Sequence, residues 1–408
     1  MSAQLPLYQT ILDRITAAVP SALRRSAITR LALLTTGILA AKSTVLAQIA
    51  AELHALDLTA AASPEHVERG LRRTLNDPLL QAHTCYSPVL QQVLDWDQLL
   101  RGSRQLVLSV DDSTKADQIH LFRVSLTYWG GALPLAWASW DQNVAQPTGH
   151  YWQQVDSVFD QVAALLPAGL SVVVVADRAF AVPNFIDRCA KRGWHWVVRV
   201  TTTGSHRFRD SRGHELSLRE VVRQQLKQPG QRWKARGWVF KDAGWRQASV
   251  VGLWSVGTKE SLVVLSDLRA QWVVLGHYER RFWCEPGFRN DKSKGWQWEA
   301  SQVQGVVHHA VLLLGMAWAS LVAVCAGLAA AEERLAQEAE RRAGGSRGQV
   351  RPTRESVFTL GVRAVRRWLY GTARTALRWS VSLLDGPSWE RTWHACQATW
   401  LIFSPAGP

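Results

Sequence analysis

The sequence predicts an α/β protein in which a strand-rich middle lies between two helical ends. Apolar residues recur at three- and four-residue spacing in the first hundred residues, while short apolar and alternating runs dominate from Gln105 onward. Helical patterning returns at Val273. The chain has 408 residues, 47% of them hydrophobic and 20% charged, which is typical of a folded protein with room for two or three domains.

Residues 1–100 are predicted to form a helical N-terminal domain. Helical periodicity runs through Ile28–Leu53 and again through Val67–Leu75. Ser63 followed by Pro64 is a favourable helix start, with an N-cap residue before proline in the first turn. Basic residues in these helices either face solvent or, as a group, track DNA phosphates: Arg24, Arg25, Arg30, Arg69, Arg72 and Arg73.

Residues 101–200 are predicted to form the first part of an α/β core. The pattern predicts three strands that form a meander, then helix, strand, helix and strand: Leu106–Val110, His120–Tyr128, Ala132–Trp140, Trp152–Leu165, Leu170–Ala176, Pro183–Arg192 and Trp194–Val200. The run Leu170–Ala176 is apolar throughout, as expected for a strand covered on both faces. This order of elements is the order of the ribonuclease-H-like fold.

The rest of the chain divides by composition into three parts. Residues 201–270 are predicted to be a β-rich insertion with four tryptophans among short alternating runs: Trp233, Trp238, Trp245 and Trp254. Residues 271–343 return to helical patterning and form the second part of the core. Residues 344–408 are predicted to be a basic helical C-terminal region, because eight Arg and one Glu lie between Gly344 and Arg378. Such a region suits nucleic acid, a membrane surface or a solvated tail.

Charge and cysteine content narrow the class of protein. The formal net charge of +14 favours a polyanionic partner, either nucleic acid or an anionic membrane. Five widely spaced cysteines without a C-x-x-C pair predict neither a disulfide framework nor a zinc ribbon. Residues 1–10 show no secretory signal. The uncharged segment Ala310–Ala331 is long enough to span a bilayer, but its small residues favour a helix buried in the core, so a membrane partner is not expected.

Acidic residues follow two of the predicted strands. Asp111 and Asp112 come directly after the first strand, and Asp177 comes directly after the fourth. These two strands are neighbours in the predicted sheet, so their ends meet. Carboxylates brought together repel unless a cation lies between them, and Mg²⁺ is the cation that such oxygen ligands suit best. Taken singly, each Asp is as well explained as a turn residue or a helix cap.

A third acidic residue lies in a segment with regular spacing. Tyr278, Arg281, Glu285 and Lys292 are 3, 4 and 7 residues apart, which places them on one face of a continuous helix. Such a face suits a metal ligand among phosphate-holding groups, although an amphipathic helix with surface ion pairs has the same pattern. Pro286-Gly287 is a poor helix interior and predicts a kink or a helix start there.

Together these residues resemble a known family. The pattern Y-x(2)-R-x(3)-E-x(6)-K in 278–292 is similar to the signature of transposases of the insertion-sequence-4 group, in the DDE superfamily. Val110–Thr114 resembles the family's first Asp motif, and Asp177–Phe180 resembles its second. The resemblance covers Gln105–Glu299 well and the N-terminal helices more loosely.

The resemblance implies the roles of six residues. Asp112, Asp177 and Glu285 would be the catalytic residues and would hold two Mg²⁺ ions, with Mn²⁺ able to substitute. Tyr278, Arg281 and Lys292 would bind DNA. Asp112 is preferred to Asp111 because it stands immediately before Ser113-Thr114. Only one of the pair is expected to be a ligand, since successive strand residues face opposite sides.

The resemblance also implies an activity. The chain would bind the terminal inverted repeats of its element, cleave the ends and join the 3′ hydroxyl to target DNA, as a homodimer in the bacterial cytoplasm and associated with the nucleoid. Some relatives excise through a DNA hairpin with a base stacked on tryptophan, although each of the four tryptophans of 201–270 is better explained as a core residue of the insertion. The alternatives are another ribonuclease-H-like nuclease, such as a resolvase, a domesticated transposase that only binds DNA, and a membrane protein anchored by Ala310–Ala331.

Overall fold

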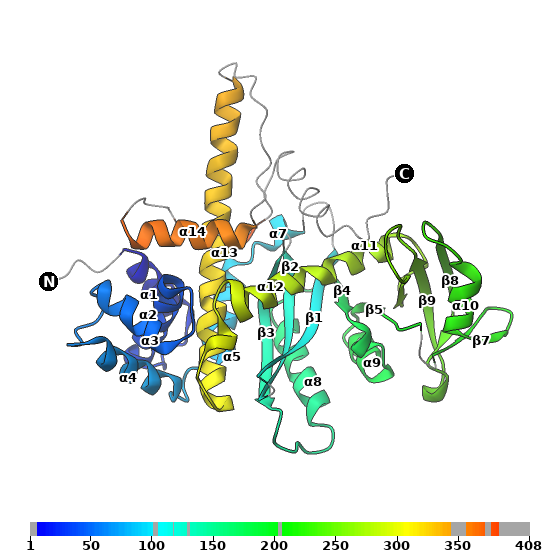
Figure 1. Ribbon diagram of the computed structural model, residues 1–408, viewed down its shortest axis with the longest axis horizontal. Coiled ribbons are helices and arrows are strands. Elements are labelled where there is room, and N and C mark those ends of the chain that lie inside the picture. Colours follow the sequence, from blue (N-terminus) through cyan, green and yellow to red (C-terminus); the bar gives the residue numbers. More distant parts are fainter. Residues whose placement is uncertain are drawn as a thin grey trace.

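A ten-stranded mixed sheet runs through the centre of the protein, in the strand order β3-β2-β1-β4-β5-β10-β9-β8-β6-β7 (Figure 1). The computed structural model describes residues 6–100, 105–116, 118–128, 131–202, 206–343, 356–371 and 377–382. The strands are β1 (Gln105–Lys115), β2 (Ile119–Tyr128), β3 (Gly131–Asp141), β4 (Ser171–Ala176), β5 (His195–Arg199), β6 (Arg207–Arg209), β7 (Glu215–Ser217), β8 (Arg232–Val239), β9 (Arg246–Leu253) and β10 (Leu262–Ser266). The predicted α/β class is confirmed.

The strand directions differ along the sheet. β1, β2 and β3 form an antiparallel meander, as predicted, whereas β1–β4 and β4–β5 pair in parallel. The predicted neighbourhood of the first and fourth strands is therefore confirmed. β10, β9 and β8 continue the sheet beyond β5 in antiparallel pairing, so the strands of residues 201–270 extend the same sheet.

The first strand is longer than the sequence suggested. β1 does not end before Asp111 and Asp112 but continues to Lys115. Its pairing with β4 stops at Val110, while its pairing with β2 goes on through Asp111 and Asp112. The expectation that these two acids follow the strand is wrong, because β2 supplies backbone partners beyond the point where the apolar run stops.

Both faces of the central strands are covered. On one face Leu108 and Val174 belong to the same apolar cluster as Phe159 of α8 (His150–Ala163) and Phe185 of α9 (Pro183–Lys191). On the other face, Val107, Val173 and Val175 pack with Val274 and Tyr278. β4 is buried on both sides, as predicted from its uninterrupted apolar run.

Along the chain a short helix, α10 (Leu218–Gln225), lies between β7 and β8, and a 3₁₀ turn, η2 (Lys241–Ala243), lies between β8 and β9. The four tryptophans of this region are half-buried. Trp233 packs edge-on against Phe208, and the guanidinium of Arg209 lies over the rings of Trp238 and Trp245. These contacts engage Trp233, Trp238 and Trp245 in packing, and Nε1 of Trp254 donates to the backbone oxygen of Thr258.

Four helices gather at the opposite end of the molecule, at the left of Figure 1: α1 (Pro6–Ala18), α2 (Arg25–Ala41), α3 (Leu46–Ala55) and α4 (Pro64–Leu75). The first hundred residues also form α5 (Ala82–Cys85), which contacts α13 (Val306–Ala343), α6 (Ser87–Val93), which contacts β3, and α7 (Trp96–Leu99), which lies near β2 in Figure 1. The predicted helix start at Ser63-Pro64 is confirmed, with Ser63 at the N-cap of α4.

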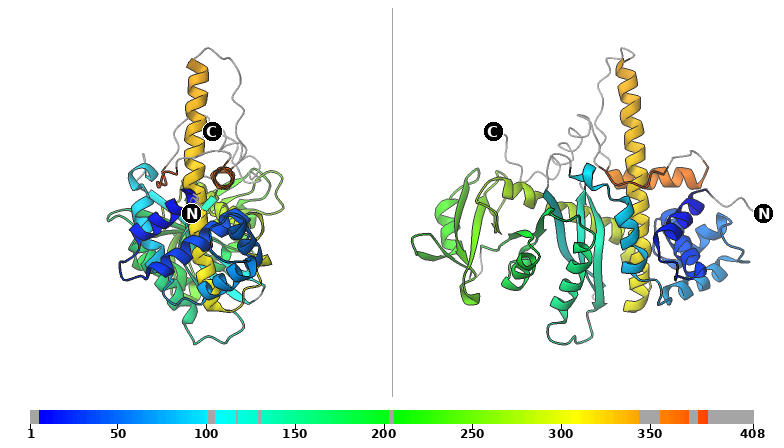
Figure 2. Two further views of the ribbon diagram at one scale, coloured as in Figure 1. Left: turned by 90° about the vertical axis from the view of Figure 1, so that its left-hand side faces the viewer. Right: turned by 180° about the vertical axis from the view of Figure 1, so that it is seen from behind.

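The 38-residue helix α13 (Val306–Ala343) stands between α1–α4 and the sheet, and its C-terminal part projects beyond them (Figures 1 and 2). It contacts α2, α4, α5, β3 and α14 (Val357–Leu369). By length and hydropathy it is the one described helix that alone would suit a membrane span, but its apolar window is 100% buried inside the protein. The segment Ala310–Ala331 thus packs as a core helix. Most of the predicted C-terminal region, 344–408, lies outside the described residues.

Candidate active site

Three carboxylates from distant parts of the chain converge on one guanidinium group. Nη2 of Arg281 lies 3.0 Å from Oδ2 of Asp111 and 3.6 Å from Oδ2 of Asp177, and Nη1 lies 2.7 Å from Oε1 of Glu285. Arg281 itself is buried, whereas the side chains of Asp177 and Glu285 are 34% and 43% exposed. The group therefore opens to solvent on the side of these two acids.

The sheet brings the two aspartates together. Val110 of β1 and Ala176 of β4 are register partners, and each is followed directly by an aspartate of the group. Asp177 also caps the short η1 helix (Arg178–Phe180), where its carboxylate accepts the backbone N–H of Arg178 at 2.5 Å. The position of Asp177 is thus set by the end of a fully buried strand and by a cap.

A helical segment supplies the other two members. It runs through α11 (Val273–Glu279), the 3₁₀ turn η3 (Arg280–Trp283), α12 (Cys284–Arg289) and the π turn η4 (Asn290–Lys294). Backbone angles stay in the right-handed helical region at each junction, so Pro286 does not break the path. Arg281 and Glu285 are one turn apart on it, which allows their ion pair.

Asp112 lies outside this group. Its Oδ2 accepts the hydroxyl of Tyr151 at 2.9 Å, and its Oδ1 lies 3.0 Å from Nε2 of His120. His120 in turn stacks on Trp140, with ring centroids 4.3 Å apart. Because β1 is still a strand here, Asp111 and Asp112 face opposite sides of the sheet. The structure brings together Asp111, Asp177 and Glu285, and leaves Asp112 in a separate polar cluster.

The two remaining DNA-binding candidates occupy different surroundings. Tyr278 is 1% exposed and packs in the apolar layer beneath the acids, edge-on to Phe282. Its burial raises the pKa of the phenol, which stays protonated. Lys292 is partly exposed, and its Nζ lies 3.7 Å from Oε1 of Glu299. Arg281 and Glu285 meet as the predicted single face requires, while the continuous helix on which that face was predicted is interrupted by the 3₁₀ turn η3 and the π turn η4.

Burial and nearby charge have opposite effects on the pKa of the Asp111 carboxyl group. Burial raises the pKa of its carboxyl group, while the charge of Arg281 and a contact with the Cys284 thiol lower it. Sγ of Cys284 lies 3.3 Å from Oδ2 of Asp111, and burial raises the pKa of this thiol, so the thiol remains the donor. Sequence patterns gave no indication of Cys284 in this position.

The donor chemistry of the group suits a hard divalent cation. Three carboxylates from three elements surround a single positive charge, and carboxylate oxygens are the ligands that Mg²⁺ prefers. Among the described residues no three His, Cys, Asp or Glu side chains lie close enough to share a metal ion, since Arg281 stands between the acids.

A comparison with known protein families matches a segment that carries part of this group, and Asp111 lies outside the matched residues. Residues 150–322 match the family described as "Transposase DDE domain". The matched segment contains Asp177, Arg281 and Glu285. This segment is less than half of the chain, and its similarity to the family agrees with the predicted resemblance to DDE transposases. The insertion-sequence-4 group and its four-residue signature stay predictions.

The comparisons with curated proteins and with solved structures give no further support for a function. No curated protein matches the chain. A solved structure described as "Cryo-EM structure of piggyBac transposase synaptic complex with hairpin DNA (SNHP)" is similar with a TM-score of 0.42 and 8% identity, over 99% of this chain and 85% of that chain. At this TM-score the similarity carries no argument about site or activity.

Proposed function

We propose that the chain is a DDE transposase that cuts the ends of its element and joins the 3′ hydroxyl to target DNA. The observation that carries the proposal is the convergence of Asp111, Asp177 and Glu285 within a chain that contains a transposase DDE domain. The strand order β3-β2-β1-β4-β5, with β1 and β4 parallel, supports a ribonuclease-H-like arrangement of the core.

We propose Asp111, in place of Asp112, as the first acid of the site. The carboxylate of Asp111 shares Arg281 with the other two acids, whereas Tyr151 and His120 already engage both oxygens of Asp112. In this assignment Asp112 is a positioning residue on the other side of β1. It holds the first turn of α8 through Tyr151.

The three carboxylates would hold magnesium or manganese ions. A metal ion at these carboxylates would supply the positive charge that activates the attacking oxygen and offsets charge on the leaving oxygen. Arg281 keeps the acids oriented and limits their mutual repulsion. Lys292 is the candidate that would hold a backbone phosphate near the cut. Tyr278 would pack in the apolar layer next to the acids and so help to fix their positions.

DNA is the proposed partner, in the form of the element's terminal inverted repeats and the target. The helices of residues 1–100 are proposed to take part in end binding, and a homodimer would pair the two ends. The net charge of +14 supports an anionic partner. A nuclease that cuts without joining remains the alternative, and the products of the reaction separate the two.

The test is a cleavage and joining assay with end DNA taken from the inverted repeats that flank the gene. We expect cleavage with Mg²⁺ or Mn²⁺, none with a chelator, and joined products with target DNA. Asp177→Asn and Glu285→Gln should each lower the rate about 100-fold or more. Glu260→Gln, which removes an exposed acid paired with Arg199, should leave the rate unchanged. Full activity in Glu285→Gln would contradict the proposed site, and binding without cleavage by the parent chain would contradict the proposed function.

A further inference from the structure

A stripe of positive charge runs along one face of β8. Lys234 and Arg236 are exposed, and so is Arg232 two residues before Lys234. Alternate residues of a strand share a face, so these three side chains, here called the β8 stripe, lie on one face of the sheet. The residues opposite them on β9 carry no charge: Leu253, Val251 and Ser249.

The contacts of Lys234 and Arg236 are made with neutral groups. Nζ of Lys234 lies 5.2 Å from the ring centroid of Trp272. Nη2 of Arg236 donates to the side-chain oxygen of Gln247 at 3.3 Å. Within the described part of the chain, neither of these two cations pairs with an Asp or a Glu. Both therefore keep a positive charge that no carboxylate offsets.

The register of the strands places the β8 stripe on the same face of the sheet as the acidic group. Paired residues of neighbouring strands share a face. One row of such partners crosses the sheet from β8 to β5: Lys234, Val251, Val264 and Arg199. In β4, which pairs in parallel with β5, this row continues to Asp177, one residue beyond the last paired position. Lys234 and Asp177 thus lie on one face.

The helix α11 lies over this face between the β8 stripe and the acids (Figure 1). It packs on the apolar layer to which the valines of β4, β9 and β10 belong. Trp272, which directly precedes α11, contacts Lys234. Arg281, the second residue after α11, contacts the acids. The stripe and the acidic group are therefore found at the two ends of one packed helix.

The separation of the two groups suits a few base pairs of DNA. Four strand-to-strand steps lead from β4 to β8, which gives roughly 19 Å between the backbones of Asp177 and Lys234. The path along α11 from Trp272 to Arg281 covers nine residues, or roughly 13 Å. These lengths correspond to about four to six base pairs.

We propose that the β8 stripe binds the phosphate backbone of the DNA that is cut at the acidic group, about four to six base pairs from the cut. This inference rests on the proposed function and assigns a DNA contact to the strand-rich segment 201–270. Cations without carboxylate partners suit phosphates, and phosphate contacts carry no sequence information. The stripe would thus hold and orient the DNA, whatever its sequence.

The test is the salt dependence of DNA binding by the full chain, measured by fluorescence anisotropy. The labelled end duplex extends about ten base pairs to either side of the cut, far enough to reach the stripe. Each lost phosphate contact lowers the slope of log K against log salt concentration by about 0.9, so Lys234→Gln/Arg236→Gln should lower it by about 1.8. Lys234→Arg/Arg236→Lys keeps both charges and should keep the slope within about 0.5 of the parent's.

Two controls locate the effect. Arg219→Gln/Arg223→Gln removes the same charge from exposed positions on α10 and should leave the slope within about 0.5 of the parent's. Leu226, directly after α10, lies against Gly252, which faces the other side of the sheet from its neighbour Val251. A short duplex that ends about three base pairs to either side of the cut does not reach the stripe, so the parent and the stripe variant should bind it with equal slopes.

The outcomes separate this inference from the proposed function. An unchanged slope in Lys234→Gln/Arg236→Gln, with a parent chain that cuts end DNA, overturns the stripe and leaves the transposase assignment intact. An equal loss in the α10 variant also overturns it, because net charge alone then explains binding. An equal loss on the short duplex contradicts the distance from the cut.

Two further measurements complete the test. β8 pairs with β6 at one position only, and charged residues on such an edge also prevent strands of different molecules from pairing. Self-association of the stripe variant with an unchanged slope would assign the cations to that role and overturn DNA binding. If the double variant unfolds below the parent's midpoint, the single variants Lys234→Gln and Arg236→Gln decide, each with an expected decrease in slope of about 0.9.

Discussion

Removal of Arg123 should destabilise the protein strongly, because its partner Asp291 is buried with it. Arg123 on β2 pairs through Nη1 with Oδ2 of Asp291 in η4, and the two side chains are 5% and 9% exposed. The guanidinium also lies 3.9 Å from the ring centroid of Phe288. This pair fastens the segment after Glu285 to the strand that pairs with Asp111.

The size of the expected destabilisation follows from the burial of the Arg123–Asp291 pair. Arg123→Met leaves an uncompensated carboxyl group in the interior, and breaking such a pair costs about 3–5 kcal/mol. Urea unfolding at pH 7, followed by circular dichroism, measures this change. Arg72→Met is the matched control, since Arg72 is 62% exposed and pairs with Glu68 one turn away, an interaction of about 0.5 kcal/mol or less.

A second variant separates the contribution of the ion pair to stability from that of side-chain packing. Arg123→Met/Asp291→Leu removes both charges and should recover most of the loss, as replacement of buried ion pairs by apolar residues often does. If Arg123→Met costs less than about 1 kcal/mol, the reasoning that η4 is held by a buried charge pair fails.

Three further variants test the packing and the electrostatics. Gly361→Ala should cost about 1–3 kcal/mol in urea unfolding, because its Cβ would lie 1.6 Å from a backbone oxygen of α13, whereas Gly70→Ala, with open space around it, should not destabilise the fold. Burial lowers the pKa of His309 to about 4 in the folded state, so its contribution to stability is present above pH 6.5 and is lost as pH falls toward 4. When the pH is lowered from 7.5 to 5, the free energy of unfolding should therefore fall by about 2 kcal/mol less in His309→Gln than in the parent. Equal decreases in urea unfolding at the two pH values would refute this. Tyr151→Phe removes a donor to Asp112 and should cost about 1 kcal/mol while cleavage of end DNA stays within about threefold of the parent; a large loss of cleavage would place Asp112 in the active site.

Sequence patterns predicted those elements whose structure depends mainly on residues that are close together in the chain. β4 is a continuous apolar run and the start of α4 is marked by Ser63-Pro64, so both were predicted near their observed bounds. That β1 and β4 are neighbours in the sheet followed from the order of elements. Asp177 was predictable for the same reason, because it directly follows a fully buried strand.

The first acid depended on a contact that is distant in sequence. Whether Asp111 or Asp112 faces Arg281 is decided by the extension of β1, and that extension depends on its pairing with β2. The Ser113-Thr114 motif favoured Asp112, but a motif does not fix which face of a strand a side chain takes. Likewise, Lys292 keeps the expected spacing in sequence, yet the π turn η4 directs it toward Glu299.

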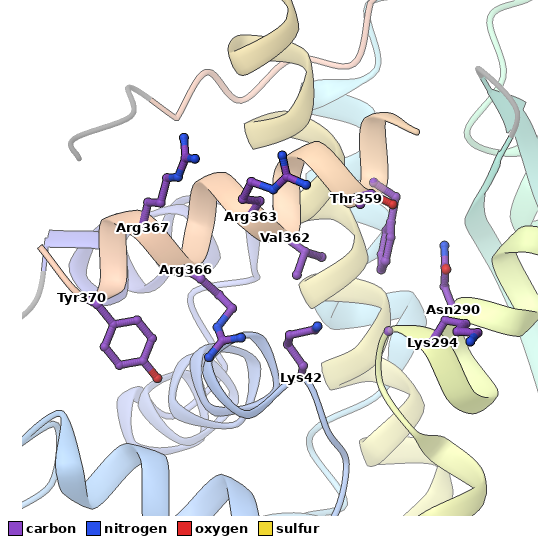
Figure 3. A pocket seen from close by; sticks show the side chains of 11 residues that line it. Lys42, Asn290, Lys294, Thr359, Val362, Arg363, Arg366, Arg367 and Tyr370 are labelled. Atoms are coloured by element: carbon purple, nitrogen blue, oxygen red, sulfur yellow. The ribbon is translucent and has the colours of Figure 1, made fainter. Parts of the chain in front are cut away.

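A pocket of about 530 Å³ between α14, the end of α2 and η4 also joins residues that no sequence pattern connects (Figure 3). Lys42 lies more than three hundred residues before Arg366, and both meet only because α2 and α14 pack on α13. The tight crossing at Gly361 is equally invisible in sequence, since a glycine inside a helix suggests a weak point rather than a contact.

The comparison of Asp111→Asn with Asp112→Asn tests the central claim most directly. Metal-dependent cleavage of end DNA is measured for both variants, with Asp177→Asn as the reference for a lost ligand and unfolding midpoints as the check on folding. The arrangement around Arg281 predicts that Asp111→Asn falls about 100-fold or more, as Asp177→Asn does, while Asp112→Asn keeps most of the parent's rate. A folded Asp111→Asn that cuts at the parent's rate, with an inactive Asp112→Asn, would contradict the account.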